Sequence, residues 1–316
     1  MARPITFKKA MKEWRLYLFL VPSFAMIATF EYFPAATAIY HSFFRWDGGT
    51  VEQYIGTDNF SNALHDATLW AAFGTVFILI VANLFKMIPS ILVAVLIHRL
   101  RSDSAQYRYR VMFVVPMIIP GLVMLLIWKF FYDANFGILN QLLDVTHLKG
   151  ALVWLDANVL GWKVFSNVVP IQWLSEPKLV LPSLIFWGFP WIGVVGVLIY
   201  LAGLQAISRD VYEAADLDGI GPVKLFWYIE LPLIMTQIRL NLILMVIGTL
   251  QSYGLILVLL GPTGGPGGAA MVPGLWMFNK AFVEQDYGYA CALGLILFVF
   301  ILILTLINNR FVRVEK

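Results

Sequence analysis

Six long apolar stretches, separated by polar segments, limit most strongly what this chain can fold into. A helix needs about 20 mostly apolar residues to cross the hydrocarbon core of a bilayer. The stretches cover residues 16–39, 70–97, 111–132, 179–201, 233–260 and 287–307. None of them shows the alternating ten-residue pattern of a transmembrane β-barrel strand. The sequence therefore predicts an all-α membrane protein with six transmembrane helices.

The composition agrees with this class and argues against several others. The chain is 60% hydrophobic and 13% charged, with a mean hydropathy of +0.79, whereas roughly a quarter of the residues in a soluble domain are charged. A net charge of +3 is too small to indicate a nucleic-acid partner. The single cysteine, Cys291, cannot form an intrachain disulfide, and the four histidines lack metal-ligand spacing. Neither a redox enzyme nor a metalloenzyme is indicated.

The distribution of Lys and Arg predicts the orientation, because these residues gather in cytoplasmic loops. Most of the 22 lie on one side, in the two tails and after the second and fourth stretches: Arg3, Lys8, Lys9, Lys12, Arg15, Arg99, Arg101, Arg108, Arg110, Arg209, Lys224, Arg239, Arg310, Arg313 and Lys316. The other side has Arg45, Lys149, Lys163, Lys178 and Lys280. We therefore expect both termini in the cytoplasm.

The first stretch has a second interpretation. A basic tail, an apolar run and the small-residue triplet Ala36-Thr37-Ala38 are also compatible with a cleaved signal peptide. Cleavage would leave five spans and would conflict with the charge distribution. We therefore favour an uncleaved first helix.

A polar segment at about 202–232 is longer than the connection between two spans requires. It follows the pattern E-A-A-x3-G-x9-I-x-L-P, formed by Glu213, Ala214, Ala215, Gly219, Ile229, Leu231 and Pro232. Ser208 is a candidate N-cap for a short helix, and Gly219 is suited to end that helix. We expect alanines on the exposed face, where a partner can approach closely, and an anchoring charge on Glu213. Periodicity alone would also fit an ordinary amphipathic helix at the interface.

The complete pattern resembles the cytoplasmic coupling loop of permease subunits of binding-protein-dependent ABC importers. The resemblance implies that this helix pair docks on an ATPase subunit, and that the seven motif residues transmit its movement to the spans. The chain has no G-x-x-x-x-G-K-[ST] motif. ATP and Mg²⁺ would then belong to the separate ATPase, and this chain would be neither an enzyme nor the holder of a cofactor.

Further motifs resemble those of sugar permeases and occur in the same order over nearly the whole chain. They are Leu20-Val21-Pro22, Tyr40-x-Ser42-Phe43, Gly56-Thr57-Asp58-Asn59-Phe60, Trp128 through Phe136-Gly137-Ile138-Leu139-Asn140, Trp173-Leu174, Thr263-Gly264-Gly265-Pro266 and Tyr287-Gly288-Tyr289-Ala290. The resemblance implies a multi-pass protein of a bacterial or archaeal inner membrane, the first of two non-identical permeases. Its partners would be the second permease, two ATPase subunits, an extracytoplasmic binding protein and a sugar.

This resemblance predicts four regions. They are a cytoplasmic tail over 1–15, the first helix and an outer segment over 16–69, an ABC permease core over 70–308 and a second cytoplasmic tail over 309–316. The outer segment 142–172 departs from the common pattern because it is longer. Either it contacts the binding protein or it is an inert insertion.

Polar residues within membrane spans are costly, which makes each a functional candidate. The resemblance points to Gln251, Tyr253 and Gly254 near the outer turn, and we add Trp187 and Asn241 as candidates for the substrate pathway. The competing interpretations are an interhelical hydrogen bond for Gln251 and interface anchoring for the tryptophan. Lys86 is a cation well inside the second span, and a structural role is favoured: snorkelling, pairing with Glu31 or binding helix-end carbonyls. For Lys129, near the outer end of the third span, we expect snorkelling.

Three rival functions remain. An ABC permease for another solute, such as glycerol phosphate, a polyol or an amino acid, would favour added Arg or Lys in the cavity if the solute were anionic, and the last three spans have none in mid-membrane. An ion-driven carrier would need internal repeats and buried carboxylates, and Glu31 alone qualifies. An intramembrane enzyme would need a paired nucleophile and base or a metal cluster, and neither is visible.

Overall fold

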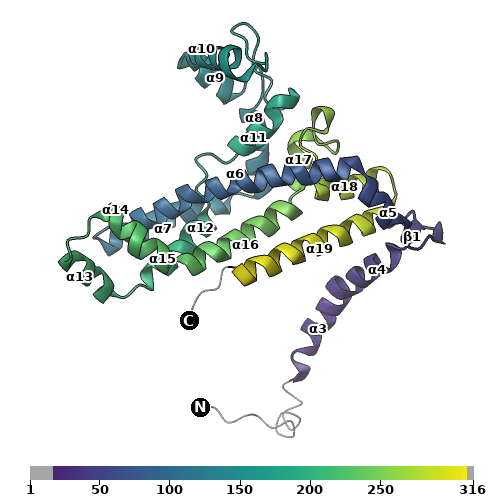
Figure 1. The fold of residues 1–316 in the computed structure, drawn as a ribbon, viewed down its shortest axis with the longest axis horizontal. Coiled ribbons are helices and arrows are strands. Elements are labelled where there is room, and N and C mark those ends of the chain that lie inside the picture. The colour runs from purple at the N-terminus through teal and green to yellow at the C-terminus, as the bar shows by residue number, and fades with distance from the viewer. Residues whose placement is uncertain (1–16, 312–316) are drawn as a thin grey trace. The chain divides into compact units, whose positions relative to one another are not determined.

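The computed structural model describes the backbone of residues 17–311 and the side chains up to residue 307. The predicted tail 1–15 lies outside this range, as does most of the tail 309–316. The described residues are mostly helical (Figure 1), and they also form one two-stranded sheet. The chain forms two compact units. The first contains the residues up to Asp66 together with Lys280–Ile296, and the second contains Ala67–Asn279 and the residues from Leu297 onward.

The first predicted span is helical. It consists of α3 (Val21–Ile27), a π-helical turn (Ala28–Tyr32) and α4 (Phe33–His41), which follow one another without a gap. Every residue from 17 to 36 is exposed, although most are apolar. Such a surface is stable only against lipid or another protein.

A short hairpin follows this helix in the first unit. Strands β1 (Phe44–Trp46) and β2 (Glu52–Tyr54) pair antiparallel and lead into α5 (Asp58–His65). The buried side chain of Asn59 donates hydrogen bonds of 2.9 Å to the carbonyl oxygens of Ser42 and Phe44. The asparagine of the G-x-x-N-F motif therefore fastens α5 to the start of the hairpin.

The last long helix, α19 (Tyr287–Phe311), begins against the same hairpin. The hydroxyl of Tyr289 donates to Asp66 Oδ2 at 2.8 Å. A Cβ atom at Gly288 would collide with the carbonyl oxygen of Phe44. Glycine at this motif position is therefore required by close backbone contact.

We expect Gly288→Ala to destabilise the protein by about 1–3 kcal/mol, the usual cost of overpacking, because the colliding atom belongs to the backbone. Thermal unfolding of the purified membrane complex measures this effect. Gly74→Ala is the matched control, since a Cβ at Gly74 in a long helix meets nothing within 4 Å. Equal melting temperatures for the two variants would show that the close contact between Gly288 and Phe44 does not contribute to stability.

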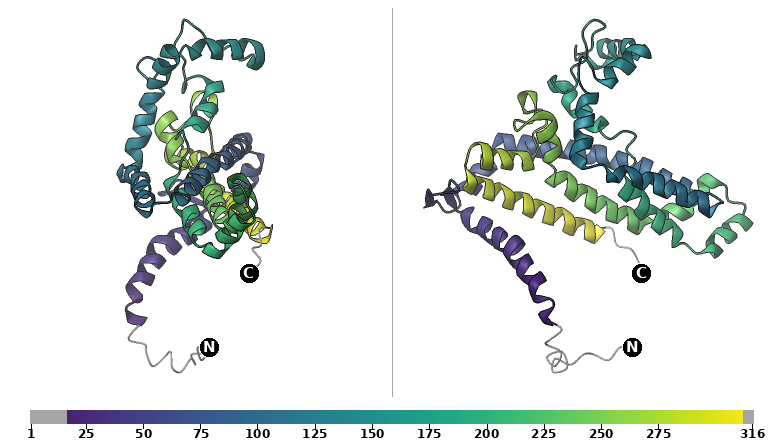
Figure 2. Two further views of the ribbon diagram at one scale, coloured as in Figure 1. Left: turned by 90° about the vertical axis from the view of Figure 1, so that its left-hand side faces the viewer. Right: turned by 180° about the vertical axis from the view of Figure 1, so that it is seen from behind.

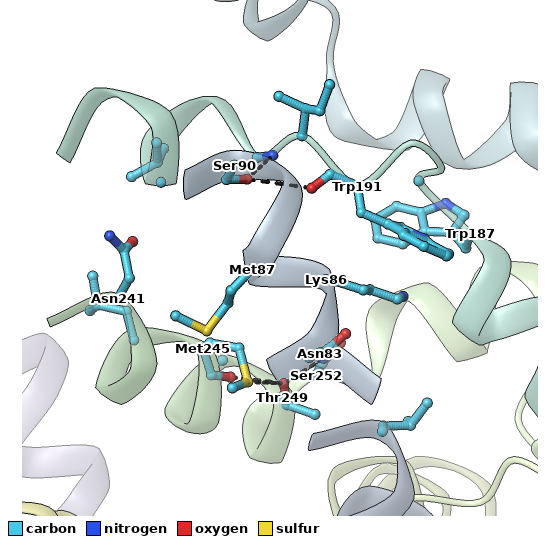
Figure 3. Close-up of a pocket in the computed structure, with 18 of the residues that line it drawn as sticks. Asn83, Lys86, Met87, Ser90, Trp187, Trp191, Asn241, Met245, Thr249 and Ser252 are labelled. Carbon is cyan, nitrogen blue, oxygen red and sulfur yellow. Dashed lines mark hydrogen bonds between the residues drawn. The ribbon is translucent and has the colours of Figure 1, made fainter. Parts of the chain in front are cut away.

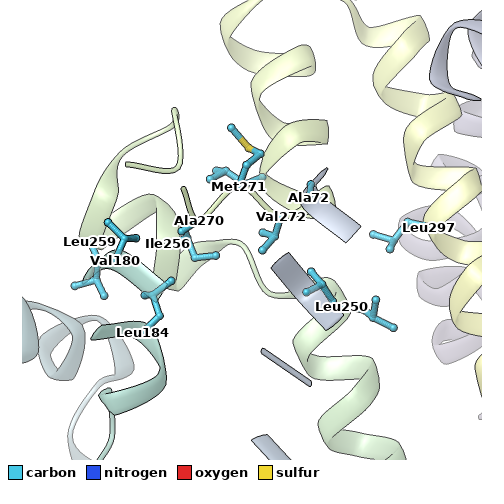
Figure 4. Close-up of a cluster of buried hydrophobic side chains, with 12 residues drawn as sticks. Ala72, Val180, Leu184, Leu250, Ile256, Leu259, Ala270, Met271, Val272 and Leu297 are labelled. Atoms are coloured by element: carbon cyan, nitrogen blue, oxygen red, sulfur yellow. The ribbon is translucent and has the colours of Figure 1, made fainter. Parts of the chain in front are cut away.

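The second unit is organised around α6 (Ala67–His98), which packs against α12 (Val194–Gln205), α16 (Met235–Gln251) and α18 (Pro273–Phe278). Two further views show α6 and α16 running side by side (Figure 2). One buried apolar cluster joins Ala72, Val76, Leu184, Leu250 and Leu275 with seven other side chains (Figure 4). A second cluster lies near the other end of α6 and includes Val197, Tyr200, Leu204 and Ile234.

Two described helices are long and apolar enough to span a membrane, Ala67–His98 and Tyr287–Ile307. The other apolar stretches of this unit contain interrupted helices. α7 (Asp103–Val114) continues as a 3₁₀ turn (Val115–Ile118) and meets α8 (Gly121–Phe131) at a bend of 85°. Pro116 and Pro120 lie in this bend, and proline cannot continue the helical hydrogen bonding.

The fourth and fifth predicted spans are interrupted as well. α11 (Pro177–Phe186) is separated from α12 by irregular backbone over residues 187–193, and α16 is separated from α17 (Gly254–Leu260) by Ser252 and Tyr253. The remaining elements are α13 (Arg209–Leu217), α14 (Pro222–Leu225), a π-helical turn (Phe226–Glu230), α15 (Leu231–Leu233), a 3₁₀ turn (Pro266–Gly268) and a second π-helical turn (Asn279–Val283).

The long outer segment has its own local structure. It contains α9 (Ile138–Val145), α10 (Leu148–Leu155) and a π-helical turn (Asp156–Leu160). The buried Asp156 carboxylate accepts four backbone N–H bonds of 2.7–3.0 Å from residues 162–165. Burial acts to raise the pKa of Asp156, but these bonds favour the charged form and hold the pKa below its usual value.

Two of the sequence motifs meet in this region. The side-chain oxygen of Asn140 accepts a hydrogen bond of 3.0 Å from Trp173 Nε1, and its amide nitrogen donates to the carbonyl oxygens of Ala134 and Ile171. The asparagine of F-G-I-L-N and the tryptophan of W-L therefore join the two ends of the outer segment.

Candidate functional site

A cavity of about 620 Å³ lies in the second unit, where α6, α12 and α16 approach one another. This volume is in the range of small-molecule sites. Its lining is mostly apolar but contains a set of polar and aromatic side chains (Figure 3): Asn83, Lys86, Ser90, Trp187, Trp191, Asn241, Thr249 and Ser252. No Asp or Glu occurs among the described residues that line it.

The interruptions within the fourth and fifth predicted spans, over residues 187–193 and 252–253, both reach the cavity. Trp187, Trp191 and Gly193 from the first, and Ser252 from the second, are lining residues. At membrane depth, irregular backbone is tolerated only where it is buried in protein or lines a cavity. The irregular backbone of both interruptions therefore forms part of the cavity wall.

Contacts to α6 hold the first interruption in place. Ser90 Oγ accepts a hydrogen bond of 2.9 Å from the backbone N–H of Gly193. Trp191 has a φ of 61°, which is unfavourable for a bulky residue, and its indole nitrogen donates to the carbonyl oxygen of Ile185 at 3.1 Å. Backbone conformations of this kind cluster at functional sites.

Several of the polar groups already have partners within the protein. Asn83 Nδ2 donates to Thr249 Oγ1 at 2.9 Å, and this hydroxyl donates to the carbonyl oxygen of Met245 at 2.8 Å. The indole nitrogen of Trp187 is different, because it is buried and finds no acceptor among the described residues. An unfilled donor in a cavity indicates a place for a ligand acceptor or a water.

Lys86 extends toward the tryptophan side of the cavity (Figure 3). Its Nζ lies 3.4 Å from the carbonyl oxygen of Leu184, near the end of α11, and 6.0 Å from the centre of the Trp191 ring. Of the three roles considered from the sequence, the structure shows a contact with a helix-end carbonyl. Lys129 Nζ donates a similar hydrogen bond of 3.1 Å to the carbonyl oxygen of Val258. The sequence predicts only snorkelling for this side chain, so this contact was not expected.

The residues expected along the substrate pathway divide into two groups. Trp187 and Asn241 line the cavity. Gln251, Tyr253 and Gly254 are not among its lining residues; all three are exposed, and Tyr253 stacks on Phe278 with ring centres 5.6 Å apart. Sequence reasoning did not single out Asn83 and Ser90, although both are polar residues within an apolar stretch.

The motif segment begins where α12 bends by 73° into α13. The helix predicted there is present and ends as expected. Gly219 has a φ of +66°, its N–H bonds to the carbonyl oxygen of Asp216, and the N–H of Ile220 bonds to that of Ala215. These two bonds define a Schellman C-cap. Ser208 occupies the N-cap position, but its side chain makes no capping hydrogen bond, which corrects the expected cap.

The motif residues differ in exposure. Glu213 and Ala214 are exposed, and Glu213 pairs with Arg209 at 3.2 Å on the surface. Ala215 is only 3% exposed, so the expectation that the alanines lie on the exposed face is wrong for it. Consecutive residues on a helix point about 100° apart, which turns Ala215 toward the rest of the second unit. Of the second half of the motif, Ile229 and Leu231 are half-buried and Pro232 is exposed.

The motif segment also has large apolar side chains that are exposed. Leu217 is 89% exposed, Tyr228 is 76% exposed, and Val223 and Trp227 are more than half exposed. We call these four residues the coupling face. A group of exposed large apolar side chains on a polar segment is typical of a protein–protein contact site.

Residues at the end of α6 form a clamp on the motif segment, which consists of hydrogen bonds and an ion pair. Arg99 donates to both carboxylate oxygens of Glu230, at 3.2 and 2.6 Å, and to the carbonyl oxygen of Pro222 at 2.9 Å. The Glu230 side chain is fully buried. His98 Nε2 lies 3.0 Å from the hydroxyl of Tyr212, and burial together with the Glu230 charge raises the pKa of Tyr212 to about 12, so this hydroxyl stays protonated. One helix end therefore holds both helices of the motif.

A family model described as "Binding-protein-dependent transport system inner membrane component" matches residues 68–314. The chain belongs to this family. Its members are the permease subunits of ABC importers, which are transport components rather than enzymes.

Curated relatives match the permease over nearly its full length. It is 25% identical to the multiple sugar-binding transport system permease protein of Streptococcus mutans, over 97% of this chain and 98% of that protein. It is 28% identical to the trehalose/maltose transport system permease protein of Thermococcus litoralis, over 99% and 98%. It is 26% identical to the sulfoquinovosyl glycerol transport system permease protein of Agrobacterium fabrum, over 94% and 90%.

Solved structures show the same fold. A chain of a bacterial ABC transporter involved in the import of the acidic polysaccharide alginate matches with a TM-score of 0.76 at 20% identity, over 97% of the permease and 99% of that chain. A chain of the bacterial alginate transporter in complex with a pentasaccharide-bound periplasmic protein matches with a TM-score of 0.78 at 21% identity, over 97% and 96%. The fold is that of an ABC importer permease.

Proposed function

We propose that this permease carries a carbohydrate across the membrane as one of two membrane subunits of an ATP-driven importer. Two described features support the proposal together. A cavity whose mostly apolar lining includes several polar side chains lies where two spans are interrupted. The motif segment, which carries the coupling face, is fixed to the end of α6, and α6 also lines the cavity. The names of the full-length relatives, several of which specify sugars, point to a carbohydrate as the cargo.

The proposed topology has six spans with both termini in the cytoplasm of a bacterial or archaeal cell. The spans are α3–α4, α6, α7–α8, α11–α12, α16–α17 and α19. The motif segment connects the fourth and fifth, so it lies on the side that carries most of the Lys and Arg residues. The outer segment 142–172 then faces the side from which the binding protein delivers its ligand.

In the proposed coupling step, an ATPase subunit docks on the coupling face and on Glu213, Ala214 and Gly219. Because Arg99 ties the segment to α6, a movement of the segment displaces that helix as well. Ala215, Ile229 and Leu231 are buried or half-buried and anchor the segment to the second unit, while Pro232 is exposed at the start of the fifth span. ATP and Mg²⁺ belong to the ATPase, and no group of three His, Cys, Asp or Glu residues that could hold a metal occurs in the described part of this chain.

In the proposed pathway, the carbohydrate passes through the cavity. An amide such as Asn241 can pair with two sugar hydroxyls, and the rings of Trp187 and Trp191 can stack on the apolar face of a sugar. Gln251, Tyr253 and Gly254 lie outside the cavity lining, so we assign them to the outer approach to the cavity. The second permease completes the wall, and an extracytoplasmic binding protein delivers the ligand.

Reconstitution tests this function. The permease, its second membrane subunit, two ATPase subunits and the binding protein are placed in liposomes with ATP inside. We expect ATP-dependent accumulation of a radiolabelled sugar that the binding protein recognises. Accumulation that continues without ATP and collapses with the ion gradient would instead identify an ion-driven carrier.

The coupling face gives a second test. Leu217→Glu should reduce retention of the ATPase subunits during purification at least tenfold, because a charge would enter an apolar contact, while the melting temperature of the permease stays within about 1 °C since Leu217 is exposed. Val168→Glu is the matched control, because Val168 is also 89% exposed but lies in the outer segment. If the Leu217 variant retained the ATPase subunits fully, the coupling face would not be part of the ATPase interface.

A further inference from the structure

Lys86 is the one cation among the described residues that line the cavity, and none of these residues is acidic. Its side chain is partly buried, and the described residues place no carboxylate within ion-pair distance of it. An ammonium group at membrane depth is costly unless it is paired or reaches water. The described lining therefore contains one cationic side chain and no anionic one.

The hydrogen bonding around Lys86 is incomplete. An ammonium group has three donors, and the described structure shows one acceptor, the Leu184 carbonyl oxygen, at a distance of 3.4 Å. That distance is long for an N–H···O bond, which usually measures 2.7–3.2 Å. The buried indole nitrogen of Trp187 is a further donor without an acceptor in the same cavity.

A purely structural role explains Lys86 less well than it explains Lys129. Lys129 makes a shorter bond, 3.1 Å, to the carbonyl oxygen of Val258 in an exposed position where water can solvate the charge. Lys86 has a longer bond in a more enclosed position, and it points toward Trp187 and Trp191 (Figure 3). Two donors with unused capacity facing an apolar cavity form a site for an oxygen anion.

We propose that the cavity selects an acidic carbohydrate, with the ammonium group of Lys86 and the indole N–H of Trp187 binding its anionic group. The proposal rests on the importer function above and names the class of its cargo. The sugar ring then lies against Trp191, while Asn241 pairs with its hydroxyls. The anion supplies the counter-charge that Lys86 lacks in the described structure.

Equilibrium binding to the whole complex tests this assignment. The complex is held in nanodiscs with ATP and a hydrolysis-deficient ATPase, without binding protein, so that the permease alone determines selectivity. The probes are a galacturonate disaccharide and its methyl ester, a sulfonated hexose and its parent hexose, and a hexose phosphate. We expect the acidic member of at least one pair to bind ten- to a hundredfold tighter than its neutral counterpart, as a hydrogen bond to a charged group implies. The panel also shows whether the group is a carboxylate, sulfonate or phosphate.

Variants separate the anion site from a structural lysine. Lys86→Gln should abolish the preference for the acidic probe, while Lys86→Arg should restore most of it because the charge is kept. Lys129→Gln is the control, since it removes a lysine–carbonyl contact away from this cavity and should leave the preference intact. Equal binding of acidic and neutral probes by the wild type, or a preference that survives Lys86→Gln, overturns the proposal. Because ATP-driven sugar uptake is measured separately, that result would leave the importer function standing.

Discussion

Replacing Arg99 by alanine is expected to cost about 3–5 kcal/mol of stability, the usual effect of leaving a buried charge without its partner. The Glu230 side chain is fully buried, and Arg99 donates to both of its oxygens. The substitution also removes the bond to the Pro222 carbonyl. We expect a large loss of properly assembled complex in the membrane, and sugar uptake to fall with it. Thermal unfolding in detergent and quantitative immunoblotting measure these effects.

A double variant distinguishes a lost ion pair from general damage to the segment. Arg99→Met combined with Glu230→Leu removes both charges, so it should recover at least half of the stability lost in Arg99→Ala, since an apolar replacement of a buried pair is often nearly neutral. Arg209→Ala is the matched control, because its pair with Glu213 is exposed and worth about 0.5 kcal/mol or less. If Arg99→Ala lowered the stability no more than Arg209→Ala does, the pair between Arg99 and Glu230 would contribute as little to stability as an exposed ion pair.

The helix end at Gly219 could be predicted from the sequence, but the pairing of Arg99 with Glu230 could not. The helix ending at Gly219 was predictable because helix termination is local chemistry, readable from a few adjacent residues. Glu230 occupies a position that the motif leaves free, and Arg99 fits equally well as one of many cytoplasmic charges. The two residues are 131 positions apart. Their pairing depends on how α6 packs in the second unit, which the sequence of either segment does not encode locally.

The cavity, too, could be predicted only in part from the sequence. The apolar stretches 179–201 and 233–260 each predict one span, because hydrophobicity alone does not distinguish a helix from a bend. The breakers were visible, since Gly188, Pro190 and Gly193 lie inside the first stretch. Their meaning depends on α6, where Ser90 accepts the N–H of Gly193. Lys86 was noticed as an unusual residue, but its place in the cavity requires the tertiary packing.

The two sites are connected through one element. α6 lines the cavity with Asn83, Lys86 and Ser90, and the residues at its end hold the motif segment through His98 and Arg99. α16 also lines the cavity, and it follows directly on the second half of the motif. The motif segment therefore binds to the end of α6 and adjoins α16 across a bend of 67° at Ile234, and both of these helices line the cavity.

Gly219→Val is expected to lower both substrate-stimulated ATP hydrolysis and transport, because it disturbs the turn between the two helices of the motif segment. The φ of +66° costs an ordinary residue roughly 1–2 kcal/mol, and a β-branched residue is especially unsuited to it. The Schellman cap would open, and the angle between α13 and α14 would change at the proposed ATPase contact. We expect the substrate-stimulated ATPase rate and the uptake rate both to fall at least tenfold, while the complex still assembles, because Gly219 is exposed and belongs to neither buried cluster.

Gly219→Asn separates backbone conformation from side-chain contact. Asparagine adopts the left-handed region far more readily than valine, and a Cβ at this position meets no atom within 4 Å. If the turn itself transmits the movement, Gly219→Asn should keep most of the uptake that Gly219→Val loses. If both variants lose uptake equally, the partner requires a bare backbone at this position for direct contact. If both transport normally, the turn has no role in coupling, and transmission must rely on the clamp between Arg99 and Glu230.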